Sequence, residues 1–562
     1  REGASMILGI DLGTTNSLVA FHDGTAVRLI PNSRGKTVTP SVVGVDGHGT
    51  YLIGTSAANQ ALGNPGRTVQ QVKRQIGQRR TLSLGDATYS PEEVSAMILR
   101  ELRRQAEAFT GKTVRTAVVT VPAHFDDHQR YSTVEASLLA GFRSVHLLNE
   151  PTAAALPYTT RGEGTERIVV FDFGGGTLDV TCLERRGREY LVRATVGDGQ
   201  LGGTDVDRRL ADHILSTVET QFGATTAEDP RVRQLVLALA EEAKIDLSER
   251  QETEVSVPFL AHAQGPNHLS LTIQRDQLER MVAPLVERAR SLTSRALQEA
   301  YFDTHGFDRI VLAGGSSRMP AIREMLAREF GGDLAYEINP EEVIAAGAAL
   351  YGYNLSRGTD GFSLRDVLSG TLAIELADGS CVPLVRKNQT VPVEQTRLFT
   401  TVSDHQKEAE IHLVQGNHSQ AWRNRSLGRF VLRDIRVAPQ GGARIAVSVG
   451  VSRDGIVTVR AGDRDTGANQ QMVARARPEP ARQQVSGNRR DYGDSLLRRL
   501  GRLKGLADPD LAVEIDEATA ALPQWNADDS AEDILTVLET LLREIVIAVS
   551  EEPGKERQHA AS

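Results

Sequence analysis

The chain has 562 residues, which is too many for one hydrophobic core, so we expect three or four domains. Hydrophobic residues make up 40% and charged residues 24% of the sequence, an ordinary composition for a soluble protein. A net charge of −9 and a pI of about 5.9 provide no basic surface for nucleic acid or for an anionic membrane.

Cysteine usage and apolar patterning exclude further classes of protein. The two cysteines, Cys182 and Cys381, lie far apart and lack metal-type spacing, so we expect neither a disulfide framework nor a zinc site. The longest apolar stretch, residues 534–549, contains three charged side chains, so no membrane span is predicted. No signal peptide is recognisable, and residues 1–5 read as a leader or an expression remnant before Met6. The expected location is cytoplasmic.

Two similar strand-turn-strand segments occur in the first half of the chain. Residues 7–24 contain an apolar run, a Gly-Thr-Thr turn and a second apolar run. Residues 168–184 repeat this plan around three consecutive glycines, and each copy has an aspartate just before its turn. This weak internal repeat predicts two similar lobes.

Helices alternate with strands between and beyond the two copies, which predicts an α/β fold. The expected helices lie near 91–109, 126–140, 204–222, 229–247, 275–302 and 319–330. The expected strands lie at 116–122, near 253–260 and at 309–315, and one more strand ends at residue 148.

The pattern changes near residue 355. Residues 356–361 have the composition of a linker, and short strands with alternating apolar residues follow without helical patterns. Asp454-Gly455 is a strong hairpin signal between two of them. We therefore expect a separate antiparallel β domain, with strands at 371–377, 409–416, 429–435, 444–452 and 455–463.

A small helical region is expected at the end. Residues 477–490 form a polar connector, a helix start is expected at Ser530 with Asp533, and the tail after Pro553 is expected to be disordered. Apolar residues recur at helical spacing in two stripes, namely Leu496, Leu497, Leu500 and Leu503, and then Ile534, Leu538, Leu541, Ile545 and Val549. The basic cluster of Arg498, Arg499 and Arg502 on the first helix is interpreted as a solvated face.

The glycine-rich turns point to phosphate chemistry. Glycines let backbone N–H groups approach phosphate oxygens, and threonine hydroxyls add donors. Aspartates beside a phosphate would repel it unless a cation stood between them, so Asp11, Asp172 and Asp179 imply Mg²⁺, held partly through water. Ordinary glycine-rich hairpins without a ligand are the alternative, and the presence of two copies makes this alternative unlikely.

A third motif is a strand that runs into Gly314-Gly315-Ser316-Ser317. Its backbone could approach a base or ribose, with Arg318 stacking on a purine, or the segment could be a packing turn.

The order of motifs carries a resemblance to a known family. The stretches "GIDLGTTNS", "VPAHFDDHQR", "NEPTAAAL", "FDFGGGTLDV", "LGGTDVD" and "VLAGGSSRMP" resemble the nucleotide-domain motifs of DnaK-type chaperones, the seventy-kilodalton heat-shock protein family. The β region is similar to that family's peptide-binding domain, and the resemblance covers roughly residues 7–475.

The resemblance implies a multidomain α/β plus all-β chain. Its parts are a two-lobed actin-like ATPase domain, a β-sandwich substrate-binding domain and a short helical lid. The implied boundaries are 6–355 for the ATPase domain, 356–366 for the linker, 367–480 for the β domain, 485–550 for the lid and 551–562 for the tail.

The resemblance also implies site residues and cofactors, with ATP or ADP and Mg²⁺ bound between the lobes. Lys73 would orient the attacking water and the γ-phosphate, a role that rests wholly on the family, since the sequence alone reads it as a surface helix lysine. Glu150, Asp172 and Thr177 complete the catalytic set. The implied nucleotide-binding residues are Asp11, Gly13, Thr14, Thr15, Gly174, Gly175, Gly176, Asp179, Gly202, Gly203, Lys244, Ser248, Gly314, Gly315, Ser316 and Arg318.

Coupling and peptide residues are implied in the same way. Pro122, Arg130 and Asp366 fit the family's relay from nucleotide to linker. The implied peptide-cleft residues are Ile374, Phe399, Val402 and Ile411, and ordinary strand core is the alternative for them.

Some positions depart from the family pattern. In the linker "FSLRD" (362–366), Ser363 and Arg365 replace apolar residues, so we expect weaker docking, at about 1.5–3 kcal/mol for each lost side-chain burial. His146 stands where the bacterial family usually has an arginine that contacts J-domain co-chaperones, which leaves that partnership open.

Three functions compete at this stage. The first is a slow, peptide-coupled ATPase that acts as a chaperone on unfolded, hydrophobic segments. Its expected partners are a J-domain co-chaperone and a nucleotide-exchange factor, and its expected state is a monomer. The second is a weakly hydrolysing scaffold dedicated to one client. The third, an actin-like filament or a sugar kinase, is disfavoured by the β domain.

Overall fold

The computed structural model describes residues 6–158, 164–260, 267–331, 333–357, 363–473, 489–520 and 531–551. The expectations for residues 1–5, for the helix start at Ser530, for the tail after Pro553 and for most of the 477–490 connector lie outside these residues.

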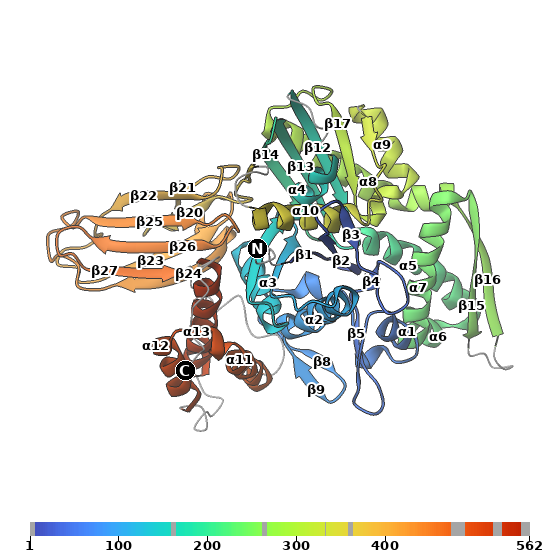
Figure 1. Ribbon diagram of the computed structural model, residues 1–562, viewed down its shortest axis with the longest axis horizontal. Helices are drawn as coiled ribbons and strands as arrows, with labels where there is room; N and C mark the ends of the chain where they lie inside the picture. The colour runs from blue at the N-terminus through green and yellow to red at the C-terminus, as the bar shows by residue number, and fades with distance from the viewer. Residues whose placement is uncertain are drawn as a thin grey trace.

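The first glycine-rich hairpin lies at the centre of a six-stranded sheet (Figure 1). β1 pairs antiparallel with β2 and parallel with β10, and β10 ends at Val121 because Pro122 has no N–H to continue the ladder. The strands are β1 (Ile7–Leu12), β2 (Asn16–His22), β3 (Val27–Leu29), β4 (Thr39–Pro40), β10 (Thr116–Val121) and β11 (Ser144–Asn149).

The second hairpin has the same place in a second six-stranded sheet, so the predicted repeat is confirmed. β12 pairs antiparallel with β13 and parallel with β17, as β1 does with β2 and β10. The strands are β12 (Thr165–Phe173), β13 (Leu178–Arg186), β14 (Glu189–Asp198), β17 (Arg309–Ala313), β18 (Asp333–Ala335) and β19 (Ser363–Arg365). We call the regions around these sheets the first and second lobes.

Helices cover both sheets and close a core in each lobe. Helix α2 begins with a capping box of Ser90 and Glu93 and ends at Gly111, where φ is +67°. The helices are α1 (Thr55–Gly63), α2 (Pro91–Thr110), α3 (Asp127–Leu139), α4 (Glu150–Ala155), α5 (Gly203–Phe222), α6 (Ala224–Glu228), α7 (Pro230–Glu249), α8 (Arg275–Ala300), α9 (Pro320–Phe330) and α10 (Val343–Arg357). The additional strands are β5 (Val43–Val45), β6 (Tyr51–Ile53), β7 (Thr68–Val69), β8 (Leu82–Leu84), β9 (Ala87–Tyr89), β15 (Glu252–Leu260) and β16 (Asn267–Gln274).

After β19, residues 367–473 leave the lobes and form two four-stranded antiparallel sheets around one core, the β region (Figure 1). The Asp454-Gly455 hairpin is confirmed, with Gly455 at φ +79° between β25 and β26. The strand expected at 429–435 begins earlier, at Arg425. The strands are β20 (Leu372–Glu375), β21 (Cys381–Val385), β22 (Val393–Phe399), β23 (Ala409–Gln415), β24 (Arg425–Leu432), β25 (Ile445–Val451), β26 (Val457–Asp463) and β27 (Asn469–Val473).

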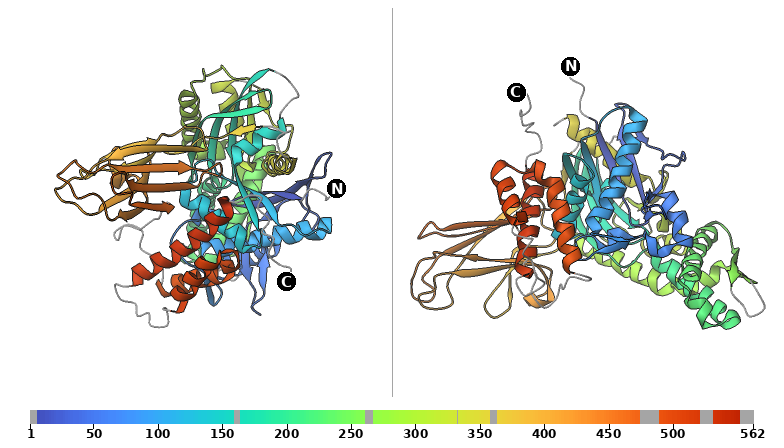
Figure 2. Two further views of the ribbon diagram at one scale, coloured as in Figure 1. Left: turned by 60° about the vertical axis from the view of Figure 1, so that its left-hand side comes forward. Right: turned by 90° about the horizontal axis from the view of Figure 1, so that it is seen from below.

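The last three described helices form a helical segment that packs against α3, β9 and β11 of the first lobe and contacts α2 through Arg499 and Glu92 (Figures 1 and 2). They are α11 (Arg489–Leu503), α12 (Pro509–Ala520) and α13 (Ala531–Glu551). The predicted apolar stripes are buried in a cluster that continues into the first-lobe core. Nowhere in the described residues is a helix both long enough and apolar enough to span a membrane.

The interpretation of Arg498, Arg499 and Arg502 as a solvated face is wrong for Arg499. Its side chain is only 4% exposed, because it points at carboxylates of the first lobe, whereas Arg502 is exposed. A helical pattern alone does not reveal a buried charged partner elsewhere in the chain.

Candidate functional site

A cavity of about 750 Å³ lies between the two lobes and brings most of the predicted nucleotide residues together. This volume is typical of a small-molecule site. The predicted residues that line it are Asp11, Gly13, Thr14, Thr15, Lys73, Glu150, Asp172, Gly174, Gly175, Gly176, Thr177, Lys244, Ser248, Gly314, Gly315, Ser316 and Arg318. Asp179, Gly202 and Gly203 are not among the lining residues.

The two glycine-rich turns approach each other closely at this cavity. A Cβ on Gly176 would meet the Thr14 Cβ at 2.8 Å, and a Cβ on Gly175 would meet the Thr15 Cβ at 3.1 Å. The Thr15 hydroxyl is buried and has no hydrogen-bond partner within the described part of the chain. Glycine is therefore required here for contact between the lobes, and a donor is left for a ligand.

Four buried carboxylates surround the turns: Asp11, Glu150, Asp172 and Asp179 are each at most 8% exposed. Burial and the charge of Glu150 raise the pKa of Asp11 to about 7. Burial raises the pKa of Asp172 well above its usual range, and neighbouring carboxylates add to this effect. Lys73, which is paired with Glu150, offsets only part of this negative charge, so the site is short of positive charge.

A divalent cation fits this shortage of charge. No three His, Cys, Asp or Glu side chains in the described ranges converge closely enough to ligate one ion directly. The carboxylates would therefore hold Mg²⁺ largely through its water shell, which Mg²⁺ tends to keep.

Lys73 lies in a 3₁₀ turn, η2 (Val72–Gln75), rather than on a surface helix, and it is 5% exposed. It forms an ion pair with Glu150 at the cavity. The adjacent Arg74 crosses to the second lobe, where its Nη2 donates to Gly176 O at 2.6 Å and to Asp205 Oδ2 at 2.8 Å. Sequence reasoning missed Arg74, since nothing local indicates its partners.

Gly202 and Gly203 support the glycine turn from behind. Gly203 N donates to Gly174 O at 2.9 Å, and Thr204 N donates to Gly175 O at 2.8 Å at the start of α5. A Cβ on Gly203 would lie 3.2 Å from Lys244 Nζ. These residues fix the turn and are not part of the cavity wall.

The far end of the cavity contains the residues expected to hold adenosine. Lys244 forms an ion pair with Asp207 at 2.7 Å, and the Ser248 hydroxyl donates to Lys244 O at 3.0 Å. Arg318 Nη2 donates to Asn339 Oδ1 at 2.6 Å. Sequence reasoning did not find the other lining side chains here, which include Ile245, Arg323 and Tyr336.

His124 connects the first lobe to Asp179 of the second. Its Nδ1 lies 2.9 Å from Asp179 Oδ1 and 3.2 Å from Asp179 Oδ2. Burial lowers the pKa of His124, but the charge of Asp179 and this hydrogen bond outweigh burial, and the pKa is raised.

The three predicted coupling residues lie on one route from the site to the linker. Phe125 N donates to Pro122 O at 3.0 Å, which closes a turn, and Arg130 Nη2 donates to Ala123 O in that turn at 3.3 Å. The same Arg130 nitrogen donates to Asn149 Oδ1 at 2.7 Å. Asn149 Nδ2 in turn donates to Asp366 Oδ2 at 2.7 Å.

The described end of the predicted linker pairs with the second lobe. Residues Ser363–Arg365 form β19, which pairs parallel with β14, and Arg365 forms an ion pair with Glu189 at 3.0 Å. This pair is largely exposed, and exposed pairs contribute only about 0–1 kcal/mol. Next to the linker, His146 is partly buried in β11, and Leu147 N donates to Asp454 Oδ1 of the β region at 3.3 Å.

The four predicted peptide-cleft residues differ in exposure. Ile374 and Ile411 are 3% and 5% exposed and belong to the core between the two sheets, and Phe399 packs partly buried against it. Val402 is 60% exposed.

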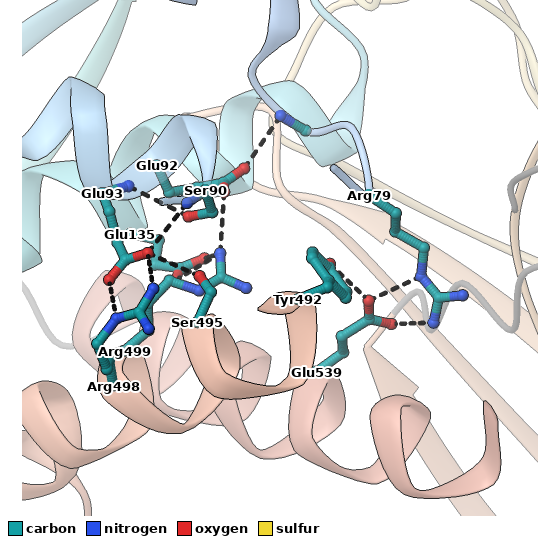
Figure 3. A network of polar contacts seen from close by, with 11 residues as sticks. Arg79, Ser90, Glu92, Glu93, Glu135, Tyr492, Ser495, Arg498, Arg499 and Glu539 are labelled. Atoms are coloured by element: carbon teal, nitrogen blue, oxygen red, sulfur yellow. Dashed lines mark hydrogen bonds and ion pairs between the residues drawn. The ribbon is translucent and has the colours of Figure 1, made fainter. Parts of the chain in front are cut away.

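A network of charges joins the helical segment to the first lobe (Figure 3). Arg499 Nη1 lies 3.0 Å from Glu92 Oε2 and 3.2 Å from Glu135 Oε1. Glu92 Oε1 accepts from Gly77 N at 3.2 Å, in the loop that follows Lys73. The Lys73 loop and the helical segment therefore share one carboxylate.

Two further groups complete the network (Figure 3). Glu93 accepts from Arg498 Nε at 2.9 Å and from the Ser495 hydroxyl at 2.7 Å. Glu539 of α13 pairs with Arg79 at 2.6 Å and accepts from the Tyr492 hydroxyl at 2.8 Å.

Comparison with known proteins gives a consistent result. A family model described as "Hsp70 protein" matches residues 7–491. The chain is 37% identical to the chaperone protein DnaK of Thermotoga neapolitana, over 98% of this chain and 94% of that relative. It is 38% identical, with the same coverage, to the proteins of that name from Thermotoga petrophila and Thermotoga maritima.

Proposed function

The chain belongs to the Hsp70 family and is an ATP-dependent molecular chaperone, and we propose that ATP between its lobes controls how tightly the β region holds hydrophobic peptide segments. The four buried carboxylates around two glycine turns, connected to the linker through Arg130 and Asp366, carry this proposal.

We assign the parts as follows. Residues 6–355 form an actin-like, two-lobed nucleotide-binding domain, and 356–366 form the linker. Residues 367–480 form a β-sandwich that binds substrate, and 485–550 form a short helical lid. The matching hairpins of the two sheets, the shared core of the β region and the helical segment support these limits.

The residues of the cavity would bind ATP in a defined orientation. Backbone N–H groups of the two glycine turns and the hydroxyls of Thr14, Thr15 and Thr177 would donate to phosphate oxygens. Ser248, Gly315, Ser316 and Arg318 would hold the adenosine end. Bound Mg²⁺ supplies charge neutralisation for the phosphates, and Asp11, Asp172 and Asp179 would hold its water shell.

Hydrolysis of ATP needs a positioned water and little covalent chemistry from the protein. Lys73 would orient this water and the γ-phosphate, since its ammonium is buried beside the phosphate turns. Glu150 and Asp172 would accept hydrogen bonds from the water, and Thr177 would donate to the γ-phosphate. We expect turnover to be slow and coupled to peptide binding.

Coupling would run through the contacts between the parts. In the described arrangement, β19 of the linker pairs with β14. The helical segment packs on the first lobe rather than over the β region, where it would act as a lid. We assign it to the state with an open peptide site. Release of Asp366 from Asn149 would free the linker and let the lid return to the β region.

The β region would bind extended hydrophobic segments of unfolded proteins near Phe399 and Val402, with Ile374 and Ile411 shaping the floor. We further propose a monomeric, cytoplasmic protein that works with a J-domain co-chaperone and a nucleotide-exchange factor.

Mg²⁺-dependent ATP turnover by the purified full chain tests the catalytic half of this proposal. Wild type should hydrolyse ATP, and Lys73→Ala should reduce the rate at least about 100-fold while ATP still binds, because positioning accounts for most of the catalysis. Equal turnover by wild type and Lys73→Ala would overturn it.

A further inference from the structure

The contact between His124 and Asp179 has no part in the function proposed so far. His124 follows β10 in the first lobe, and Asp179 lies on β13 in the second, so the contact crosses the cleft between the lobes. The carboxylate is completely buried, whereas the imidazole is 23% exposed. The contact therefore fixes a buried acid of the candidate Mg²⁺ site from the opposite lobe.

The surroundings of the imidazole are shaped to hold it there. Gly197 lies directly opposite Asp179 in the pairing of β13 and β14. A Cβ on Gly197 would lie 2.7 Å from His124 Nδ1, and a Cβ on Gly199 would lie 3.0 Å from His124 Nε2. Two glycines at the end of β14 thus leave space for this ring, which any other residue at these positions would obstruct.

The direction of the hydrogen bond follows from the chemistry of its acceptor. An ionised carboxylate only accepts hydrogen bonds, so Nδ1 must carry the proton. The neutral Nδ1–H tautomer and the imidazolium both donate in this way, so the contact does not depend on the charge of His124. A donated hydrogen bond fixes the orientation of the carboxylate oxygens.

We propose that His124 is a positioning residue of the nucleotide site, which holds Asp179 across the cleft in the orientation needed by Mg²⁺-bound ATP. This inference rests on the proposed function. His124 lies in the Pro122–Phe125 turn that Arg130 contacts at two carbonyls, so the histidine also joins the site to the coupling route. A shift of Asp179 would reach the turn through this side chain.

Three substitutions separate the hydrogen bond from the packing of the ring. In His124→Asn, the amide nitrogen has a position close to that of Nδ1 and keeps the donor. His124→Leu keeps much of the volume and removes the donor. His124→Gln places its amide nitrogen farther out, near the position of Nε2, and so misplaces the donor.

The test measures the equilibrium affinity of the full chain for ATP as Mg²⁺ is titrated, together with the affinity for ATP in EDTA. Loss of a residue that orients a metal ligand typically costs about 10–100-fold in metal affinity. We expect His124→Leu to raise the Mg²⁺ concentration at the midpoint of this titration at least about tenfold. The affinity in EDTA should stay within about twofold, and His124→Asn should resemble wild type.

A wild-type midpoint in His124→Leu, or an equal shift in His124→Leu and His124→Asn, would overturn the proposal. If His124→Leu does not fold, the pair of His124→Asn and His124→Gln decides, since only the second misplaces the donor. Failure of wild type to bind ATP at all would instead overturn the proposed function, so the two failures are distinguishable.

Discussion

Docking of the helical segment on the first lobe should depend on pH through Glu135. Three carboxylates, Glu92, Glu93 and Glu135, face two guanidinium groups, those of Arg498 and Arg499, so one acid is in excess (Figure 3). Burial raises the pKa of Glu135 to about 8, with Arg499 opposing this shift and Glu92, Glu93 and Glu539 adding to it. The docked state therefore holds a proton at neutral pH.

The sign of the effect follows from the two states of Glu135. Undocking would expose the carboxyl, whose pKa would return toward its ordinary value near about 4.3. Docking therefore takes up a proton, and its free energy becomes less favourable as pH rises through about 8. His128 sets the lower end of the pH range in which this effect can be measured. Burial lowers its pKa well below the usual value, so below about pH 6.5 His128 would gain a proton on undocking, which opposes the effect of Glu135.

The remaining charged and polar groups at this interface set the background for Glu135. Arg79, Arg543, Tyr131, Tyr492 and Glu539 also line the space between the helices and the lobe. One proton corresponds to at most about 1.4 kcal/mol per pH unit. Between pH 8 and pH 6.5 the docking constant should therefore rise roughly 10- to 30-fold.

Energy transfer between dyes on the first lobe and on α12 would measure docking. Lys112 and Glu514 are exposed labelling positions for cysteine substitution, in a chain from which Cys182 and Cys381 have been removed. Glu135→Gln should dock at pH 8 at least as tightly as wild type does at pH 6.5, and its docking should no longer depend on pH between these values. Asp212→Asn, at an exposed acid on α5, should behave as wild type. A wild-type docking constant that does not change with pH, or an unchanged slope in Glu135→Gln, would refute the reasoning.

Three further predictions follow from the site and the network. Gly176→Val should weaken ATP binding at least about tenfold in equilibrium titration, because its side chain would collide with Thr14. Arg79→Glu and Glu539→Arg should each weaken docking in the energy-transfer assay, and the double exchange should recover about 1–3 kcal/mol of coupling; additive losses would show that the pair is not coupled. Lys73→Met should bind ATP but fail to convert it in single-turnover assays, and conversion at the wild-type rate would exclude its assigned role.

Local patterns were sufficient to predict the long elements and the phosphate turns. The glycine-rich hairpins follow from apolar runs on both sides of a turn, and their similar sequences led to the two lobes. Strands of two or three residues, such as β4 and β7, were missed because they are too short to show a period.

Contacts between distant segments could not be predicted in this way. Lys73 lies in a short 3₁₀ turn without periodicity, so only the family resemblance identified it. His124, Asn149 and Arg74 have partners that are 55, 217 and 131 positions away, and no local signal marks them. Arg499 was misread for the same reason, since its carboxylates lie on α2 and α3.

The most direct test of the central claim is the affinity of the full chain for an unfolded hydrophobic peptide, measured with ATP and with ADP. If ATP between the lobes opens the β region, the peptide should bind at least about tenfold more weakly with ATP, a coupling of about 1.4 kcal/mol. Equal affinity in the two nucleotide states would contradict the account.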